Sequence, residues 1–100
     1  MSNIKIWVDD MRPAPKDYIH CRTYNEAIRV LCRGMFGDDD IEEIWLDHDL
    51  GEQKSGYDIA KFIIEERVCI GGFGCQSMNP VGRKNICELL THYGYKQLKK

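Results

Sequence analysis

The chain has 100 residues, of which 43% are apolar and 30% are charged, a composition typical of one globular domain rather than a disordered segment. Its formal net charge of −2 argues against a broad footprint for duplex nucleic acid, which usually needs a basic surface, but allows a pocket that binds one phosphate. There is no long apolar stretch for a membrane span and no secretory signal pattern at the start. We therefore expect one cytoplasmic domain over residues 1–100, without a membrane partner.

The cysteines argue against a metal or disulfide scaffold. They are five in number, an odd count, and none forms a C-x-x-C pair, so neither a disulfide framework nor a zinc site is expected. Most lie among apolar residues. We interpret them as small buried side chains in a reducing compartment, at Cys21, Cys32, Cys69, Cys75 and Cys87.

The first part of the chain predicts two short strands separated by a loop. Residues 4–8 form an apolar run that ends at two aspartates, and residues 18–22 form a second short run, as strands do. Between them, the segment from Met11 to Pro15 contains two prolines, which exclude the interior of a helix.

A helix should follow from Thr23. The Thr23–Glu26 segment has the pattern of a capping box, and apolar residues then recur at helical spacing as far as Met35. We expect Gly34 and Gly37 to end this helix. The acidic run over residues 38–40 then predicts a solvated loop or the approach to the next strand, more readily than a metal site.

The second part of the chain continues the alternation. Residues 41–46 predict a third strand, and Ser55 is placed to cap a second helix. Residues 71–75 predict a short fourth strand, after which Asn79 and Pro80 are typical of a helix start. Gly94 should close that helix, and residues 95–98 predict a marginal fifth strand.

This order implies a parallel sheet with helices on its faces. Such sheets bind ligands outside the carboxyl ends of their strands, and three polar clusters fall at those ends. They are Asp9 with Asp10 after the first strand, the trio Asp47, His48 and Asp49 after the third, and the segment 76–79 before the last helix.

Carboxylates gathered from different strand ends repel one another, and an oxygen-seeking divalent cation such as Mg²⁺ relieves this and can also hold a phosphate oxygen. Ser77 and the amides that open the last helix can donate hydrogen bonds to that phosphate, and Arg12 and Arg83 can add charged forks. The plainer alternative is that each aspartate forms a turn or a helix cap. The convergence of three clusters at one edge favours a binding site.

His48 has two interpretations. Histidine suits proton transfer near neutral pH, so His48 is a candidate catalytic residue. The simpler alternative is that His48 is a solvated neighbour of the two aspartates, or the group that orients one of them.

Four motifs in this order resemble a known family. They are D-D-x-R-P-x-P (residues 9–15), L-D-H-D-L-G (46–51), S-G-Y-D (55–58) and S-x-N-P-V-G-R (77–83). An acidic pair after the first strand, an aspartate after the third and a serine after the fourth resemble the response-regulator receiver domain. The closer resemblance, over nearly the whole chain, is to the cyclic-phosphate processing receiver-like family.

The resemblance implies a fold and a function. The expected fold is a single compact receiver-like (flavodoxin-like) α/β three-layer sandwich with a mostly parallel sheet of four or five strands, its first helix replaced by the proline-rich loop. The expected function is Mg²⁺-dependent phosphohydrolysis of a cyclic or terminal phosphate, with 2′,3′-cyclic phosphate ends of RNA as one substrate class. Partners would be a phosphorylated small molecule or an RNA end, with a protein partner left open.

The expected site follows residue by residue. Asp9, Asp10 and Asp47 would bind Mg²⁺ or Mn²⁺, with Asp49 as a further candidate ligand. Asp47 would be the nucleophile, or only a ligand if metal-activated water attacks, and His48 the proton carrier. Phosphate oxygens would be positioned by four residues, of which the third has the alternative of being only a helix cap: Arg12, Ser77, Asn79 and Arg83.

Two departures from the family pattern leave other functions open. Gln76 stands where that family usually has histidine, and no lysine clearly matches the one after the last strand of receiver domains, although Lys96, Lys99 and Lys100 lie near. One alternative is a signalling receiver that accepts phosphate on Asp47, although the weak fifth strand and the missing lysine count against it. Another is a catalytically inactive module that binds phosphate or a protein, which Gln76 favours.

Overall fold

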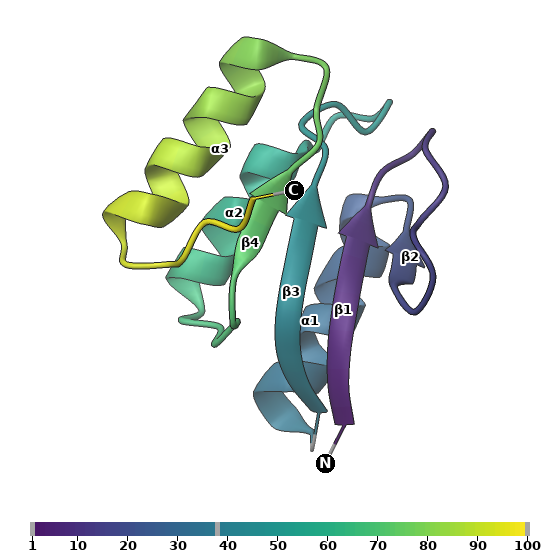
Figure 1. Cartoon of the computed structure of the whole chain (residues 1–100), viewed down its shortest axis with the longest axis vertical. Helices are drawn as coiled ribbons and strands as arrows, with labels where there is room; N and C mark the ends of the chain where they lie inside the picture. Colours follow the sequence, from purple (N-terminus) through teal and green to yellow (C-terminus); the bar gives the residue numbers. More distant parts are fainter. Residues whose placement is uncertain (1, 38, 100) are drawn as a thin grey trace.

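Strands and helices alternate along the chain as the apolar patterns predicted (Figure 1). The computed structural model describes residues 2–37 and 39–99, so the expectations for Asp38 and Lys100 lie outside the described residues. The elements are β1 (Ser2–Val8), β2 (Ile19–Cys21), α1 (Tyr24–Phe36), β3 (Asp39–Leu46), α2 (Gly56–Glu65), β4 (Phe73–Cys75) and α3 (Pro80–His92).

The four strands form a parallel sheet in the order β2-β1-β3-β4. The segment after α3 adds one parallel bridge, between Phe73 and Gln97, at the β4 edge. The amide of Phe73 donates to the Lys96 carbonyl at 2.9 Å, and the amide of Leu98 donates to the Phe73 carbonyl at 2.7 Å. The predicted fifth strand is therefore reduced to a single bridge.

One face of the sheet carries the core. Ile6, Ile44 and Phe73 stand at matched positions of β1, β3 and β4 and are fully buried. Side chains from all three helices join them in one apolar cluster, including Leu31, Ile59, Ile63, Ile86 and Leu90. Since α2 contacts both α1 and α3, the helices form one layer, and Figure 1 shows α1 passing behind β1 and β3.

The opposite face carries aromatic side chains in place of helices. The rings of Trp7 and Trp45 lie 6.4 Å apart, and Tyr18 meets Trp7 edge-on at 6.2 Å. Tyr18 belongs to the loop between β1 and β2, where the first helix was expected to be missing.

The receiver-like α/β class and the replacement of the first helix are confirmed by this arrangement. The described helices form one layer rather than the two of a three-layer sandwich. The physical reason is connectivity: β1 leads to β2 through a loop, and the segment after α3 adds only a bridge, so no described helix is left for the second face.

Capping residues set the helix starts as predicted. Thr23 caps α1 by accepting a hydrogen bond from the Glu26 amide, Ser55 caps α2, and Asn79 caps α3. The expectation that Gly34 helps to end α1 is wrong, because the helix continues to Phe36 and Gly37 caps it. A Cβ at Gly34 would lie 2.5 Å from Ile41, so this glycine allows α1 to pack closely on β3.

The cysteines are less uniform than expected. All five are free; Cys21 is buried, Cys32, Cys75 and Cys87 are partly buried, and Cys69 is exposed. The prediction of burial therefore holds for Cys21 and is wrong for Cys69. Within residues 2–37 and 39–99, no helix is long and apolar enough to cross a membrane.

Candidate active site

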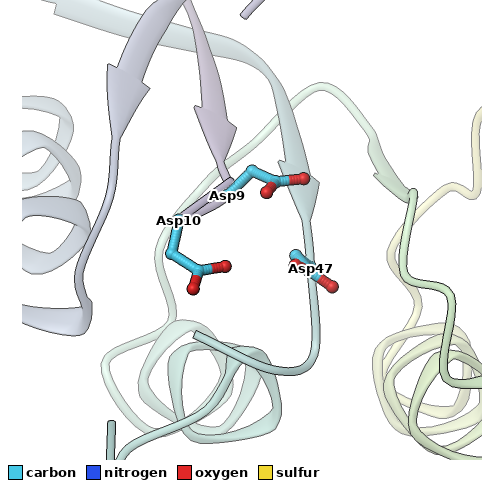
Figure 2. Close-up of side chains that lie close together, drawn as sticks. All are labelled: Asp9, Asp10 and Asp47. Atoms are coloured by element: carbon cyan, nitrogen blue, oxygen red, sulfur yellow. The ribbon is translucent and has the colours of Figure 1, made fainter. Parts of the chain in front are cut away.

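Three carboxylates converge at the carboxyl ends of the two central strands. Asp9 and Asp10 follow β1 directly, and Asp47 follows β3 (Figure 2). The register pairs Val8 with Leu46, so the residues that follow them leave the sheet at the same level. One oxygen from each aspartate lies within 4.8 Å of the others. The predicted convergence of these three residues is therefore seen in the structure.

Asp9 has a structural function of its own. Its side chain is fully buried, and Oδ1 accepts hydrogen bonds from the backbone amides of Met11 at 2.9 Å and Arg12 at 2.8 Å. The Arg12 guanidinium lies 3.3 Å from Oδ2. Asp9 therefore shapes the loop after β1, as the turn-forming interpretation expected, while it also faces the other two carboxylates.

Asp10 has room because of a turn on the neighbouring loop. Gly51 has a φ of +67°, a backbone conformation that favours glycine. A Cβ at this position would also lie 2.9 Å from Oδ2 of Asp10. The Leu50-Gly51 ending of the L-D-H-D-L-G motif therefore turns the chain and leaves space for the Asp10 carboxylate.

Asp47 is buried close to two other carboxylates. Burial raises its pKa above the ordinary value, and the nearby charges of Asp9 and Asp10 raise it further. A hydrogen bond from the Ser77 side chain and the charge of Arg12 act in the opposite direction. The carboxylate is thus crowded by like charges, a condition that a bound cation would relieve.

The first turn of α2 fixes the backbone of Asp47. The Gly56 amide donates to the His48 carbonyl at 2.9 Å, and a Cβ at Gly56 would overlap the carbonyl oxygen of Asp47. Glycine is therefore required for this close approach, which explains why the S-G-Y-D motif follows the acidic trio.

Gln76 is a buried structural residue in this chain. Its Nε2 donates to the Val8 carbonyl at 2.9 Å, and its backbone carbonyl oxygen accepts from the Arg12 guanidinium. The side chain therefore connects β4 to the end of β1, and Arg12 bridges Asp9 to the loop after β4.

The loop from Ser77 to Asn79 is held from α3. Nη1 of Arg83 donates to the Ser77 carbonyl at 3.1 Å, and the Asn79 amide donates to the Ser77 hydroxyl oxygen at 3.1 Å. Oδ1 of Asn79 accepts from the Gly82 amide at 3.0 Å. Asn79 therefore caps α3, as its alternative interpretation expected. Arg83 holds the loop that carries Ser77, whose side chain hydrogen-bonds to Asp47.

His48 and Asp49 form a pair beside the carboxylate group. Nδ1 of His48 lies 2.9 Å from Oδ1 of Asp49, and Nδ2 of Asn79 donates to Oδ2 of Asp49 at 3.3 Å. A Cβ at Gly82 would overlap the His48 ring, so the ring packs on the first turn of α3. The hydrogen bond from His48 holds the pKa of Asp49 below its ordinary value.

The predicted site residues therefore divide into two sets. Asp49 does not join the group of three close carboxylates among the described residues. His48 contacts Asp49 through Nδ1 and is not among the residues that line the carboxylate cavity.

A cavity of about 460 Å³ opens over the three carboxylates. It is lined by Asp9, Asp10, Met11, Arg12, Asp47, Asp49, Gly51 and Met78. Met11 and Met78 are about 80% exposed, and sequence reasoning gave them no function because each occupies an unspecified position of its motif. A larger groove of about 780 Å³ lies along α3, but it contains none of the predicted site residues.

The donor set fits a hard divalent cation. All three close groups are carboxylates, and such oxygen ligands suit Mg²⁺ and Mn²⁺. Two of them, Asp9 and Asp47, are buried next to like charge, a cost that the nearby Arg12 guanidinium offsets only in part. Asp9, Asp10 and Asp47 are therefore the residues that would hold such an ion.

The fold and the site together define a receiver-type domain: a parallel sheet in the order β2-β1-β3-β4, an acidic pair after β1, an aspartate after β3 and a serine after β4. The family model described as Cyclic-phosphate processing Receiver domain matches residues 4–92. The chain belongs to this family. No curated protein and no solved structure gives a significant match.

Proposed function

We propose that this domain is a Mg²⁺-dependent phosphohydrolase that acts on a cyclic or terminal phosphate, with the 2′,3′-cyclic phosphate end of an RNA as the leading candidate. The observation that carries the proposal is the position of Asp47, which is crowded by Asp9 and Asp10 and receives a hydrogen bond from Ser77. The family's link to cyclic-phosphate processing supports the substrate class.

The carboxylates would hold the cation, and Asp47 has one of two functions in the reaction. When bound, Mg²⁺ would supply the positive charge that neutralises the carboxylates and a phosphate oxygen. Asp47 either attacks phosphorus or serves only as a ligand. Ser77, whose hydroxyl lies beside Asp47, would donate to a phosphate oxygen, because phosphoryl transfer depends on positioning and charge neutralisation.

Two arginines and one asparagine would complete the phosphate subsite. Arg12 and Arg83 each donate to a carbonyl of the loop after β4, and a guanidinium has five N–H donors. The remaining donors can therefore bind phosphate oxygens. Asn79 uses Oδ1 as the cap, and its amide group would be available to a substrate oxygen if the bond to Asp49 is exchanged.

His48 is the proposed proton carrier. Asp49 holds one ring nitrogen, Nδ1, which orients the ring and leaves Nε2 as the nitrogen that would exchange a proton. His48→Gln should then lower kcat and alter its pH profile. An unchanged profile would restrict His48 to orienting Asp49.

Phosphorus NMR tests the proposal directly. Nucleoside 2′,3′-cyclic phosphates and a short RNA with a cyclic phosphate end would be followed with Mg²⁺ or Mn²⁺. We expect metal-dependent ring opening by the wild type and none by Asp47→Asn. The matched control is Asp40→Asn at the opposite end of β3, exposed and distant from the cavity, which should retain full activity. Equal turnover by both variants would refute the site.

A non-hydrolytic function is the second candidate, and the burial of Gln76 favours it. A glutamine amide does not ionise near neutral pH, and here it donates to the Val8 carbonyl. This position therefore offers no acid or base where the resemblance implies a histidine. Incubation with a small phosphodonor such as acetyl phosphate would distinguish a signalling receiver from an inactive binding module. Labelling of Asp47 without turnover would identify a signalling receiver, and binding without labelling would identify an inactive module for phosphate or a protein partner.

A further inference from the structure

Two cysteines meet directly beneath the loop that carries Ser77. Cys75 is the last residue of β4, and Cys87 lies on α3. Their Sγ atoms are 3.3 Å apart, and both thiols are free. A disulfide bond has a length of about 2.0 Å, so an approach of little more than one ångström would join the two sulfurs.

The two thiols differ in access. Cys87 lines the groove of about 780 Å³ along α3, whereas Cys75 is not among the groove residues. Nε2 of Gln97 lies 3.4 Å from the Cys87 sulfur. Burial raises the pKa of the Cys75 thiol, and the neighbouring Cys87 raises it further. A dissolved oxidant would therefore meet Cys87 first.

We propose that Cys75 and Cys87 are a redox modification site at which a low-molecular-weight disulfide forms a reversible intramolecular disulfide bond. The Cys87 thiolate attacks the external disulfide, which gives a mixed disulfide and releases one thiol. The Cys75 thiolate then attacks the Cys87 sulfur and releases the second thiol. Two cysteine thiols are oxidised and one external disulfide is reduced to two thiols, the usual exchange chemistry.

The bond would act on the candidate site through the backbone. Cys75 and Cys87 flank the segment with Ser77 and Asn79, and Arg83 on the same stretch already donates to the Ser77 carbonyl. A cross-link would add a covalent tie between the end of β4 and α3. This inference rests on the two sulfur positions and is independent of the proposed hydrolysis.

Peptide mapping provides the test. The full chain would be incubated with excess glutathione disulfide, blocked with N-ethylmaleimide and digested with trypsin. Cys75 falls in peptide 68–83 together with Cys69, and Cys87 falls in peptide 85–96. We expect these two peptides to be linked in the wild type, with the loss of two hydrogens, and to separate after reduction.

Cys69→Ser is the matched control because Cys69 shares the tryptic peptide and is exposed. It should retain the linked peptides, whereas Cys75→Ser and Cys87→Ser should each lose them. Oxidation should also raise Tm in the wild type and in Cys69→Ser, because a cross-link restricts the unfolded chain. If Cys75→Ser or Cys87→Ser fails to fold, the loss of the linked peptides in the other variant is sufficient for the test. Only glutathione adducts in the wild type, or linked peptides that persist in Cys75→Ser, would overturn the proposal.

Discussion

The two sides of the candidate site differ in how their polar groups are satisfied. On the β1–β3 side, carboxylates crowd one another and the pKa of Asp47 is raised. On the β4–α3 side, Nε2 of Gln76 donates to the Val8 carbonyl and Oδ1 of Asn79 accepts from the Gly82 amide. The buried Oε1 of Gln76 has no hydrogen-bond partner among the described residues. Like charges therefore repel one another on the first side, whereas the loop of the second side is held by hydrogen bonds from α3.

Replacing Gly56 with alanine should destabilise the β1–β3 side more than any other change considered. The new Cβ would overlap the Asp47 carbonyl oxygen, a backbone atom that cannot rotate away. We expect Gly56→Ala to lower the free energy of unfolding by about 3 kcal/mol, as overpacking against a fixed neighbour does. Chemical denaturation would measure the loss.

Gly94→Ala serves as the control for this substitution. Gly94 has a φ of +93° and open space around its Cβ position, so alanine there suffers backbone strain without overlap, at a cost of about 1 kcal/mol. Equal losses in the two variants would show that the contact between α2 and the Asp47 backbone is looser than described.

Arg12 joins the two sides, and its removal should have the next largest effect. Arg12→Ala leaves the buried Asp9 carboxylate without its cation and the Gln76 carbonyl without a donor. Breaking a fully buried ion pair would lower the free energy of unfolding by more than this. Because Arg12 is partly exposed, we expect a loss of about 2 kcal/mol. Arg22→Ala is the control, since Arg22 is exposed and its guanidinium makes a long hydrogen bond of 3.4 Å to the Asp10 carbonyl. If Arg12→Ala lowers the free energy of unfolding no more than Arg22→Ala does, then Arg12 does not join the two sides of the site.

The elements of the fold were predictable because their signals are local. The cap residues Thr23, Ser55 and Asn79 and the apolar spacing after them predicted the helix starts. Gly34 was misassigned because its function depends on Ile41, seven residues later. The single helical layer was missed for a related reason: which face a helix covers depends on connections that no local pattern specifies.

The convergence at the site was predictable, whereas the partners of its residues were not. Parallel strands end at one edge, so Asp9 and Asp47 had to approach each other. That Arg12 would bind the Gln76 carbonyl, or that His48 would pack on Gly82, depends on contacts across more than thirty positions of chain. Residue spacing contains no information on such contacts.

Asn79→Ala should lower the free energy of unfolding by about 1 kcal/mol, which is typical of the loss of an N-cap. It also removes one of the groups that hold the pKa of Asp49 below its ordinary value, so that pKa should rise. Thr23→Ala is the matched control because it removes the cap of a different helix, α1. Carbon NMR of the Asp49 carboxyl would detect the difference, and a similar shift in both variants would contradict the Asn79–Asp49 contact.

The smallest expected effect is a pair of opposite pH dependences in the metal-free protein. The folded-state pKa of Asp47 is raised above 3.8, so the stability it contributes is present below that pH and is lost as pH rises through the folded value. The folded-state pKa of Asp49 is lowered, so its contribution is present above 3.8 and is lost as pH falls. Denaturation between acid and neutral pH, with a chelator present, would compare the wild type with Asp47→Asn and Asp49→Asn.

The free energy of unfolding of the wild type relative to Asp47→Asn should fall with rising pH. The same quantity relative to Asp49→Asn should rise. Slopes of the same sign would mean that Asp47 lies in a polar environment like that of Asp49, and the crowding that favours a cation at Asp47 would be absent.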